Sequence, residues 1–311
     1  MAGSRRRFPQ VKKIGTPEAM RAHLADEGID LPLDSVVEPA PDGPLASSIR
    51  IGQHLEVENR FAILPMEGWD GTTDGMPTPD LERRWLRFGA SGAGLLWGEA
   101  TAVVPEGRAN PNQLMINEES AEILADLRRR TVAARALEFD GGRLITGLQL
   151  THSGRWSRPF GDPLPRISYR QPQLDERVPV TDASVLSDDE LDELVGAYVR
   201  AGVLAADAGF DFVDIKHCHG YLLHELLTAR TRPGRYGGSF EGRTRVLRSV
   251  VEELRAQRPN LTIGVRLSAV DPGPYLHDEE GVGYPQPLDE PAFPFGPDEH
   301  GNPLGETHQF L

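Results

Sequence analysis

The chain alternates short apolar runs with longer stretches whose apolar residues recur at helical spacing. The apolar runs have the length of strands, and they end near Leu64, Ala100, Leu150, Ile215 and Leu267. Helical spacing is found over residues 81–91, 121–139, 187–199 and 240–257. Strands that alternate with helices are typical of an α/β fold with a parallel sheet. A chain of 311 residues is long enough for one large α/β barrel or two ordinary domains.

The first 48 residues differ from the rest of the chain. They are rich in proline and charge, with one predicted helix that opens at Thr16-Pro17-Glu18. We interpret residues 1–48 as a peripheral N-terminal extension. A short hairpin is predicted over residues 49–57, where apolar residues alternate around Gly52-Gln53. No low-complexity linker follows, so residues 49–311 are predicted to form one domain.

The densest group of reactive side chains follows the apolar strand that ends at Ile215. Five residues there carry titratable groups, and they are Lys216, His217, Cys218, His219 and Tyr221. Titratable groups at the carboxyl end of a buried strand are typical of an active site in an α/β barrel. A satisfied polar cluster at the start of a helix is the alternative. A leucine stripe over residues 222–227 places His224 and Glu225 in a helical turn beyond the cluster.

Composition excludes several classes of protein. The net charge of -14 and a pI near 5.1 argue against general nucleic-acid binding. A single cysteine, Cys218, forbids an internal disulfide and fits a reducing compartment. No run approaches the roughly 18 apolar residues of a membrane span. We therefore expect a cytoplasmic protein that binds neither nucleic acid nor membrane.

Four longer motifs carry a family resemblance. The segments HGYLLHELL and RYGGSFEGRTR, the run from Gln149 to Arg155 and the run from Asn59 to Met66 resemble the old yellow enzyme family of FMN-dependent ene reductases and dienoyl-CoA-reductase-like oxidoreductases. The resemblance extends from about Ile49 to Ser268. It implies a fold of (β/α)8 barrel type, of which this sequence covers roughly the first five strand–helix units.

The resemblance also implies an activity and a cofactor site. Hydride would pass from NAD(P)H to FMN and then to the β-carbon of a small alkene activated by an electron-withdrawing group. The residues that would bind FMN are Pro65, Met66, Ala100, Gln149 and Arg266. Gln149 would hydrogen-bond the pyrimidine edge of the flavin, and Arg266 would stabilise the reduced anionic ring. The alternatives are a polar residue in a barrel layer for Gln149 and a simple salt bridge for Arg266.

The implied catalytic residues are Lys216, His219 and Tyr221. Lys216 and His219 would hold the electron-withdrawing group, and Tyr221 would give a proton to the α-carbon. The chain departs from the family pattern at Lys216, where a histidine is usual, and at Gly242, where an asparagine is usual. A lysine there would polarise a carbonyl strongly or select an anionic substrate. Glu67 replaces a threonine, cysteine or serine, and we expect its carboxylate to turn away from the flavin.

Two other interpretations remain open. His217 and His219 could be metal ligands of a barrel lyase or hydrolase, because alternate residues of a strand share a face. The chain could also be a truncated, flavin-free remnant, because five units leave a barrel open. Exposed strand edges would then favour aggregation, a homo-oligomer or another partner.

Overall fold

The structure is a computed structural model that describes residues 9–140, 142–269, 275–279, 281–286, 295–298 and 300–311. The chain divides into two compact units, Met1–Ser47 and Ser48–Leu311. The first unit holds the short 3-10 helices η1 (Val11–Lys13) and η2 (Pro44–Ala46) and the helix α1 (Pro17–Asp26). The hydroxyl of Thr16 accepts a hydrogen bond from the amide of Ala19, so α1 begins where the sequence predicts.

A parallel sheet forms the centre of the second unit. Its strands are β3 (Ala62–Ile63), β4 (Leu95–Leu96), β5 (Ala100–Ala102), β6 (Ile145–Thr151), β7 (Phe212–Ile215) and β8 (Thr262–Gly264). The order is β3-β4-β6-β7-β8, and β5 also pairs with β6. Because β4 and β5 belong to one predicted run, the sheet occupies the five expected strand positions. Within the described residues, β3 and β8 each pair on one side only.

Gly98 separates β4 from β5 in a run that we predicted to be one strand. It has a φ of 64°, and a Cβ there would lie 2.1 Å from the carbonyl oxygen of Gly147. Only glycine combines this backbone conformation with so close an approach. The chain therefore bends at Gly98, and Ala100 pairs with Gln149 on β6.

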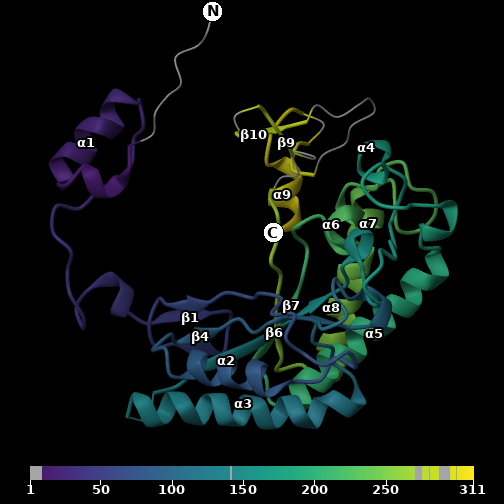
Figure 1. The fold of residues 1–311 in the computed structure, drawn as a ribbon, viewed down its shortest axis with the longest axis horizontal. Coiled ribbons are helices and arrows are strands. Elements are labelled where there is room, and N and C mark those ends of the chain that lie inside the picture. Colours follow the sequence, from purple (N-terminus) through teal and green to yellow (C-terminus); the bar gives the residue numbers. More distant parts are fainter. Residues whose placement is uncertain (1–8, 141, 270–274, 280, 287–294, 299) are drawn as a thin grey trace, which may run out of the picture. The chain divides into compact units, whose positions relative to one another are not determined.

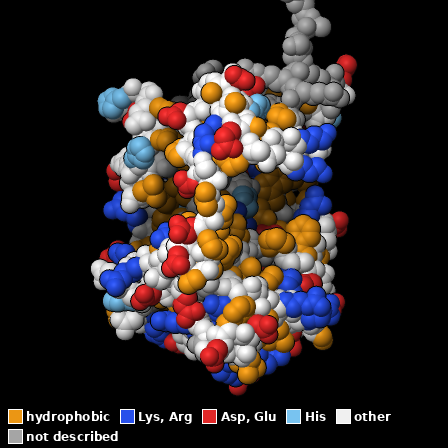
Figure 2. All heavy atoms as spheres, turned by 90° about the vertical axis from the view of Figure 1, so that its left-hand side faces the viewer, with side chains coloured by type: hydrophobic (Ala, Val, Ile, Leu, Met, Phe, Trp, Pro, Cys, Tyr) orange, Lys and Arg blue, Asp and Glu red, His pale blue; other side chains and the backbone are white. Residues whose placement is uncertain are grey.

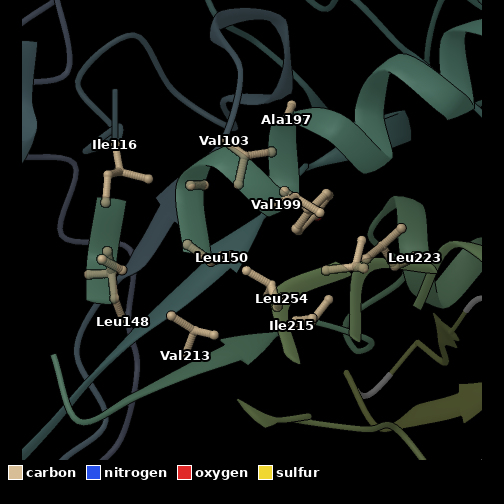
Figure 3. Packing of buried hydrophobic residues seen from close by; sticks show 14 of the residues in the cluster. Val103, Ile116, Leu148, Leu150, Ala197, Val199, Val213, Ile215, Leu223 and Leu254 are labelled. Atoms are coloured by element: carbon tan, nitrogen blue, oxygen red, sulfur yellow. The ribbon is translucent and has the colours of Figure 1, made fainter. Parts of the chain in front are cut away.

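Helices cover the sheet in pairs. α2 (Pro79–Gly89) packs beside α3 (Glu118–Glu138), and α5 (Asp188–Asp207) packs beside α8 (Arg245–Gln257) (Figure 1). Ser187 and Glu190 form the predicted capping box at the start of α5. The core lies between sheet and helices, where Val213 and Ile215 of β7 lie near Leu254 of α8 (Figure 3).

The helix predicted over residues 240–257 is in fact two helices, and that prediction was wrong. α7 (Phe240–Arg243) ends before Thr244, and α8 begins at Arg245. The Thr244 hydroxyl donates a hydrogen bond to the carbonyl of Phe240 at 2.8 Å. Thr244 has a φ of -97° and a ψ of 0°, outside the helical range, so the backbone bends between α7 and α8.

Two short hairpins and a last helix lie before and after the sheet in the sequence. β1 (Ile49–Ile51) and β2 (Leu55–Val57) form the predicted hairpin, and β9 (Tyr275–His277) pairs with β10 (Gly283–Pro285). The last helix, α9 (Gly305–Phe310), is fixed by Glu306, whose carboxylate accepts hydrogen bonds from Arg230 and Arg243 at 2.6 Å each. Among the described helices, none has the length and hydropathy needed to cross a bilayer. On the face in Figure 2, acidic and basic side chains are mixed.

Candidate active site

The register of the parallel sheet brings the predicted site residues into one row. Neighbouring partners along this row are Met66 with Glu99, Ala100 with Gln149, Gln149 with Asp214, Asp214 with Gly264, and His217 with Leu267. Apart from Ala100, which begins β5, these residues lie near or just after the carboxyl ends of their strands. The five predicted cofactor residues and the cluster after Ile215 therefore share one edge of the sheet, although they come from five separate segments.

Glu67 lies at the centre of the predicted catalytic cluster. Its Oε1 atom is 3.1 Å from the Nζ atom of Lys216, and its Oε2 atom accepts a hydrogen bond from the Tyr221 hydroxyl at 3.0 Å. The indole nitrogen of Trp69 donates to the same Oε2 atom at 3.1 Å. The side chains of Lys216 and Glu67 are 4% and 9% exposed. A carboxylate with three donors is a tightly held anion, so Glu67 fixes the two residues that we expected to be catalytic.

Tyr221 is held from two directions. The Lys216 ammonium lies 3.8 Å from the centre of its ring, which is cation–π geometry. Its hydroxyl points to Glu67. Burial, followed by the negative charge of Glu67, raises the pKa of Tyr221. At neutral pH this hydroxyl therefore carries its proton.

His219 faces solvent beside this cluster. It has a φ of 64°, which is uncommon for a residue other than glycine, and it is exposed. Its ring meets the ring of Tyr221 edge-on, with 6.4 Å between the centres. Desolvation, and then the positive charges of Lys216 and Arg266, lower the pKa of His219. The imidazole is therefore neutral at pH 7 and can donate one hydrogen bond.

Asp214 connects two of the predicted cofactor residues, Gln149 and Arg266. Its carboxylate accepts hydrogen bonds from the indole of Trp97 at 3.0 Å, from the side-chain amide of Gln149 and from the backbone amide of Arg266 at 2.6 Å. Burial raises the pKa of Asp214, and these hydrogen bonds oppose the shift. The Oε1 atom of Gln149 is buried and makes no hydrogen bond within the described chain. Gln149 thus presents one unused acceptor.

The other predicted cofactor residues lie close by. The Arg266 guanidinium donates to the carbonyl of Pro65 at 3.4 Å, and the amide of Ala100 donates to the carbonyl of Met66 at 3.3 Å. Ala100 is 1% exposed, whereas Met66 is 69% exposed. The strip formed by these residues is therefore buried at Ala100 and open to solvent at Met66.

The helix beyond the cluster rests on a buried ion pair. α6 (Leu222–Leu227) carries Glu225, whose Oε2 atom lies 2.8 Å from the Nε atom of Arg155. Oε1 of the same carboxylate accepts hydrogen bonds from the backbone and the hydroxyl of Ser168. These contacts tie α6 to the segment after β6 and to the loop around Ser168. They position Tyr221 at the start of α6.

The metal-site hypothesis finds no support in this geometry. His217 is 2% exposed, its Nδ1 atom lies 2.8 Å from the carbonyl of Ile215, and its ring faces Phe310. His219 is exposed, so the two imidazoles have different surroundings. In the part of the chain that the structure describes, no three His, Cys, Asp or Glu side chains converge as metal ligands would.

Sequence reasoning missed two residues of the site. We expected Glu67 to turn away from a cofactor and gave it no partner, and we gave Asp214 no role. For Glu67 the signal was available, because the chain departs from the family pattern by gaining an acid at Glu67 and a cation at Lys216. For Asp214 the signal was a carboxylate inside an otherwise apolar strand, which needs partners when buried.

Comparison with known proteins places this geometry in context. Residues 44–280 match the NADH:flavin oxidoreductase / NADH oxidase family. An NADPH dehydrogenase of Bacillus subtilis is 31% identical over 223 residues, which are 70% of this chain and 61% of that protein. An NADPH dehydrogenase of Bacillus pumilus is 34% identical with the same coverage. The chain therefore spans about three fifths of the length of these curated relatives.

Solved structures give the same picture of the fold. The old yellow enzyme from Pichia sp. AKU4542 superposes with a TM-score of 0.60 at 24% identity, over 74% of this chain and 61% of that one. The old yellow enzyme homologue from Zymomonas mobilis gives a TM-score of 0.59 at 28% identity, over 72% of this chain and 63% of that one. The predicted α/β fold, a partial (β/α)8 barrel, is confirmed.

Proposed function

Because this chain belongs to the NADH:flavin oxidoreductase / NADH oxidase family, we propose that it carries hydride from NAD(P)H through FMN to a small alkene activated by an electron-withdrawing group. The observation that carries the proposal is the position of the Tyr221 hydroxyl. It donates a hydrogen bond to Glu67, which directly follows the predicted cofactor residues Pro65 and Met66, and Met66 pairs with Glu99 next to Ala100. A proton donor beside a cofactor strip is what reduction of an alkene requires.

The residues of the row fit FMN. The unused buried acceptor of Gln149 suits an N–H group on the pyrimidine edge of the flavin. The Arg266 guanidinium suits the anionic reduced ring, and the small Ala100 leaves room for a flat ring beside the backbone of Pro65 and Met66. When bound, FMN would supply the hydride chemistry.

The chain's own residues would handle the substrate and the proton. His219 is neutral and exposed, so its ring N–H would donate to the carbonyl or related group of the substrate. Tyr221 would give its hydroxyl proton to the α-carbon, and its raised pKa means that the hydroxyl is protonated at neutral pH. Lys216 would hold Tyr221 in position, because its ammonium contacts both the ring of Tyr221 and the carboxylate of Glu67.

The critical test is whether this chain binds FMN, whose phosphate group needs a binding site. In the resembled barrel the loops after strands seven and eight hold the phosphate of FMN, and the described sheet has five strand positions. The purified 311-residue chain should be desalted, its visible absorption recorded, and FMN then titrated while flavin fluorescence is followed. Yellow protein, or saturable quenching at one FMN per chain, supports the proposal. Folded chain that stays colourless and quenches no flavin overturns it and supports the flavin-free remnant.

Activity is tested with the same sample. With FMN bound, NADPH or NADH should be consumed only when an enone is present under anaerobic conditions, and Tyr221→Phe should lower that rate about a hundredfold, within the usual range for loss of a general acid. Consumption that continues in air without the enone, with oxygen as the electron acceptor, would leave an NAD(P)H oxidase activity without ene reduction. A cytoplasmic location and a homo-oligomer stay predictions, which fractionation and light scattering would check.

A further inference from the structure

The charges around Tyr221 balance in pairs. Lys216 is paired with Glu67 at 3.1 Å. Arg266 and Asp214 form the second pair of opposite charges, since the Arg266 charge acts on the Asp214 carboxylate and the Arg266 backbone amide donates to it. The charged groups that act on the adjacent Cys218 thiol are these same four. His219 adds no charge at neutral pH.

This balance changes what Lys216 can do. A free ammonium at this position would attract a carboxylate of a substrate. The Lys216 side chain is 4% exposed, and its charge is already matched by a carboxylate that is itself 9% exposed. Withdrawal of either partner would leave a buried unpaired charge, which is strongly unfavourable. An anionic substrate would also approach the fixed charge of Glu67, and like charges repel most strongly where water is excluded.

We propose that Glu67 determines the substrate class: by neutralising Lys216 it makes the site select an uncharged carbonyl compound over a carboxylate. The inference rests on the proposed function for the identity of the site, but the charge pair itself is independent of FMN. Glu67 acts in two ways. It cancels the positive charge that would favour anions, and it holds the Tyr221 hydroxyl in place through a hydrogen bond.

The test compares two ligands of similar shape and different charge. Cyclohex-2-enone is neutral, and cyclohex-1-ene-1-carboxylate is anionic. Their dissociation constants for the FMN-loaded full chain should be measured by ligand-detected NMR. We expect the unsubstituted chain to prefer the ketone, and Glu67→Gln to shift the ratio of the two constants at least about tenfold toward the carboxylate, because Lys216 then lacks its counter-charge. Glu122→Gln, an equal charge change on an exposed position of α3, should leave the ratio unchanged.

A second measurement needs no flavin. The chain has only three lysines, Lys12, Lys13 and Lys216. Acylation requires an unprotonated, untethered amine, so an ion-paired Lys216 should react slowly. Mass spectrometry after limited acetylation should show Lys216 labelled faster in Glu67→Gln than in the unsubstituted chain, with Lys12 and Lys13 as internal references. Glu67→Thr serves as the second variant if Glu67→Gln does not fold.

The outcomes separate the two proposals. A chain that binds no FMN but shows faster Lys216 labelling in Glu67→Gln overturns the proposed function and keeps the charge pair. A chain that binds FMN but shows equal labelling, or an unchanged ratio of ligand affinities, overturns the role of Glu67. A native preference for the carboxylate would also overturn it.

Discussion

The hydroxyl of Tyr221 donates a hydrogen bond to the carboxylate of Glu67 at 3.0 Å, across 154 positions of sequence. This contact places a fixed negative charge beside the proposed proton donor. Both burial and that charge raise the pKa of Tyr221. The consequence is a tyrosine whose proton is hard to remove and whose donor direction is set by an acid from the segment after β3.

Glu67→Gln should therefore lower the pKa of Tyr221. The amide keeps an acceptor for the hydroxyl but removes the negative charge. Ultraviolet difference titration follows the ionisation of the six tyrosines, and Tyr221→Phe identifies the contribution of this one. The raised pKa of Tyr221 also contributes to the stability of the fold. This contribution is complete below about pH 10, where unfolded tyrosine ionises, and is lost as the pH rises above that value. Identical titrations of Glu67→Gln and the unsubstituted chain would contradict the contact.

Gln149→Leu should weaken FMN binding. The substitution keeps the approximate size of the side chain but removes the buried Oε1 acceptor that has no partner within the described chain. We expect a loss of roughly tenfold in affinity, which corresponds to about 1.4 kcal/mol and to one hydrogen bond. Flavin fluorescence quenching measures the affinity, and Gln53→Leu on the exposed hairpin turn is the matched control. Equal affinity in both variants would remove Gln149 from the cofactor site.

The sequence was enough to predict which residues lie together wherever their position follows from the order of the strands. Parallel strands bring their carboxyl ends to one edge, so the pattern of apolar runs was enough to place the ends at Met66, Ala100, Gln149 and Lys216 together. Side-chain direction could not be derived in the same way. Glu67 meets Lys216 because the segment after Pro65 turns its carboxylate inward, and no local pattern encodes that turn. The same holds for Glu306, which reaches Arg243 from 63 positions away.

Glu225→Ala should destabilise the second unit strongly. The side chain of Arg155 is 0% exposed and that of Glu225 is 6% exposed. Removal of the Glu225 carboxylate leaves the buried guanidinium of Arg155 with one negative partner fewer. Such a loss typically lowers the free energy of unfolding by about 3 kcal/mol. Asp175 also pairs with Arg155 and limits the loss. Urea unfolding measures the effect. Glu252→Ala, on an exposed position of α8, should change stability by less than about 0.5 kcal/mol; similar losses in both variants would show that the buried pair adds nothing.

Acid should destabilise the fold through its buried histidines, and His217 offers the cleanest test. Burial, against the opposing effect of the Ile215 carbonyl and with a smaller contribution from the nearby His224, lowers the pKa of His217 to about 4. Unfolded histidine binds a proton near pH 6.5, so the unfolded chain gains protons first as the pH falls. The stabilisation is therefore complete above about pH 6.5 and is lost between pH 6.5 and about 4. For one histidine at 2% exposure this amounts to roughly 3 kcal/mol.

His217→Asn should remove that pH dependence. The asparagine amide can still donate to the Ile215 carbonyl, but it does not titrate. Urea unfolding at about pH 7, 5.5 and 4.5, which brackets the titration of unfolded histidine, should show a smaller loss of stability with acid in His217→Asn than in the unsubstituted chain. His152 is also buried, with its pKa lowered to about 3, so part of the acid sensitivity will remain. His54→Asn, at an exposed position of the hairpin, should retain the full pH dependence, and parallel curves for His217→Asn and His54→Asn would show that His217 is not held neutral by the fold.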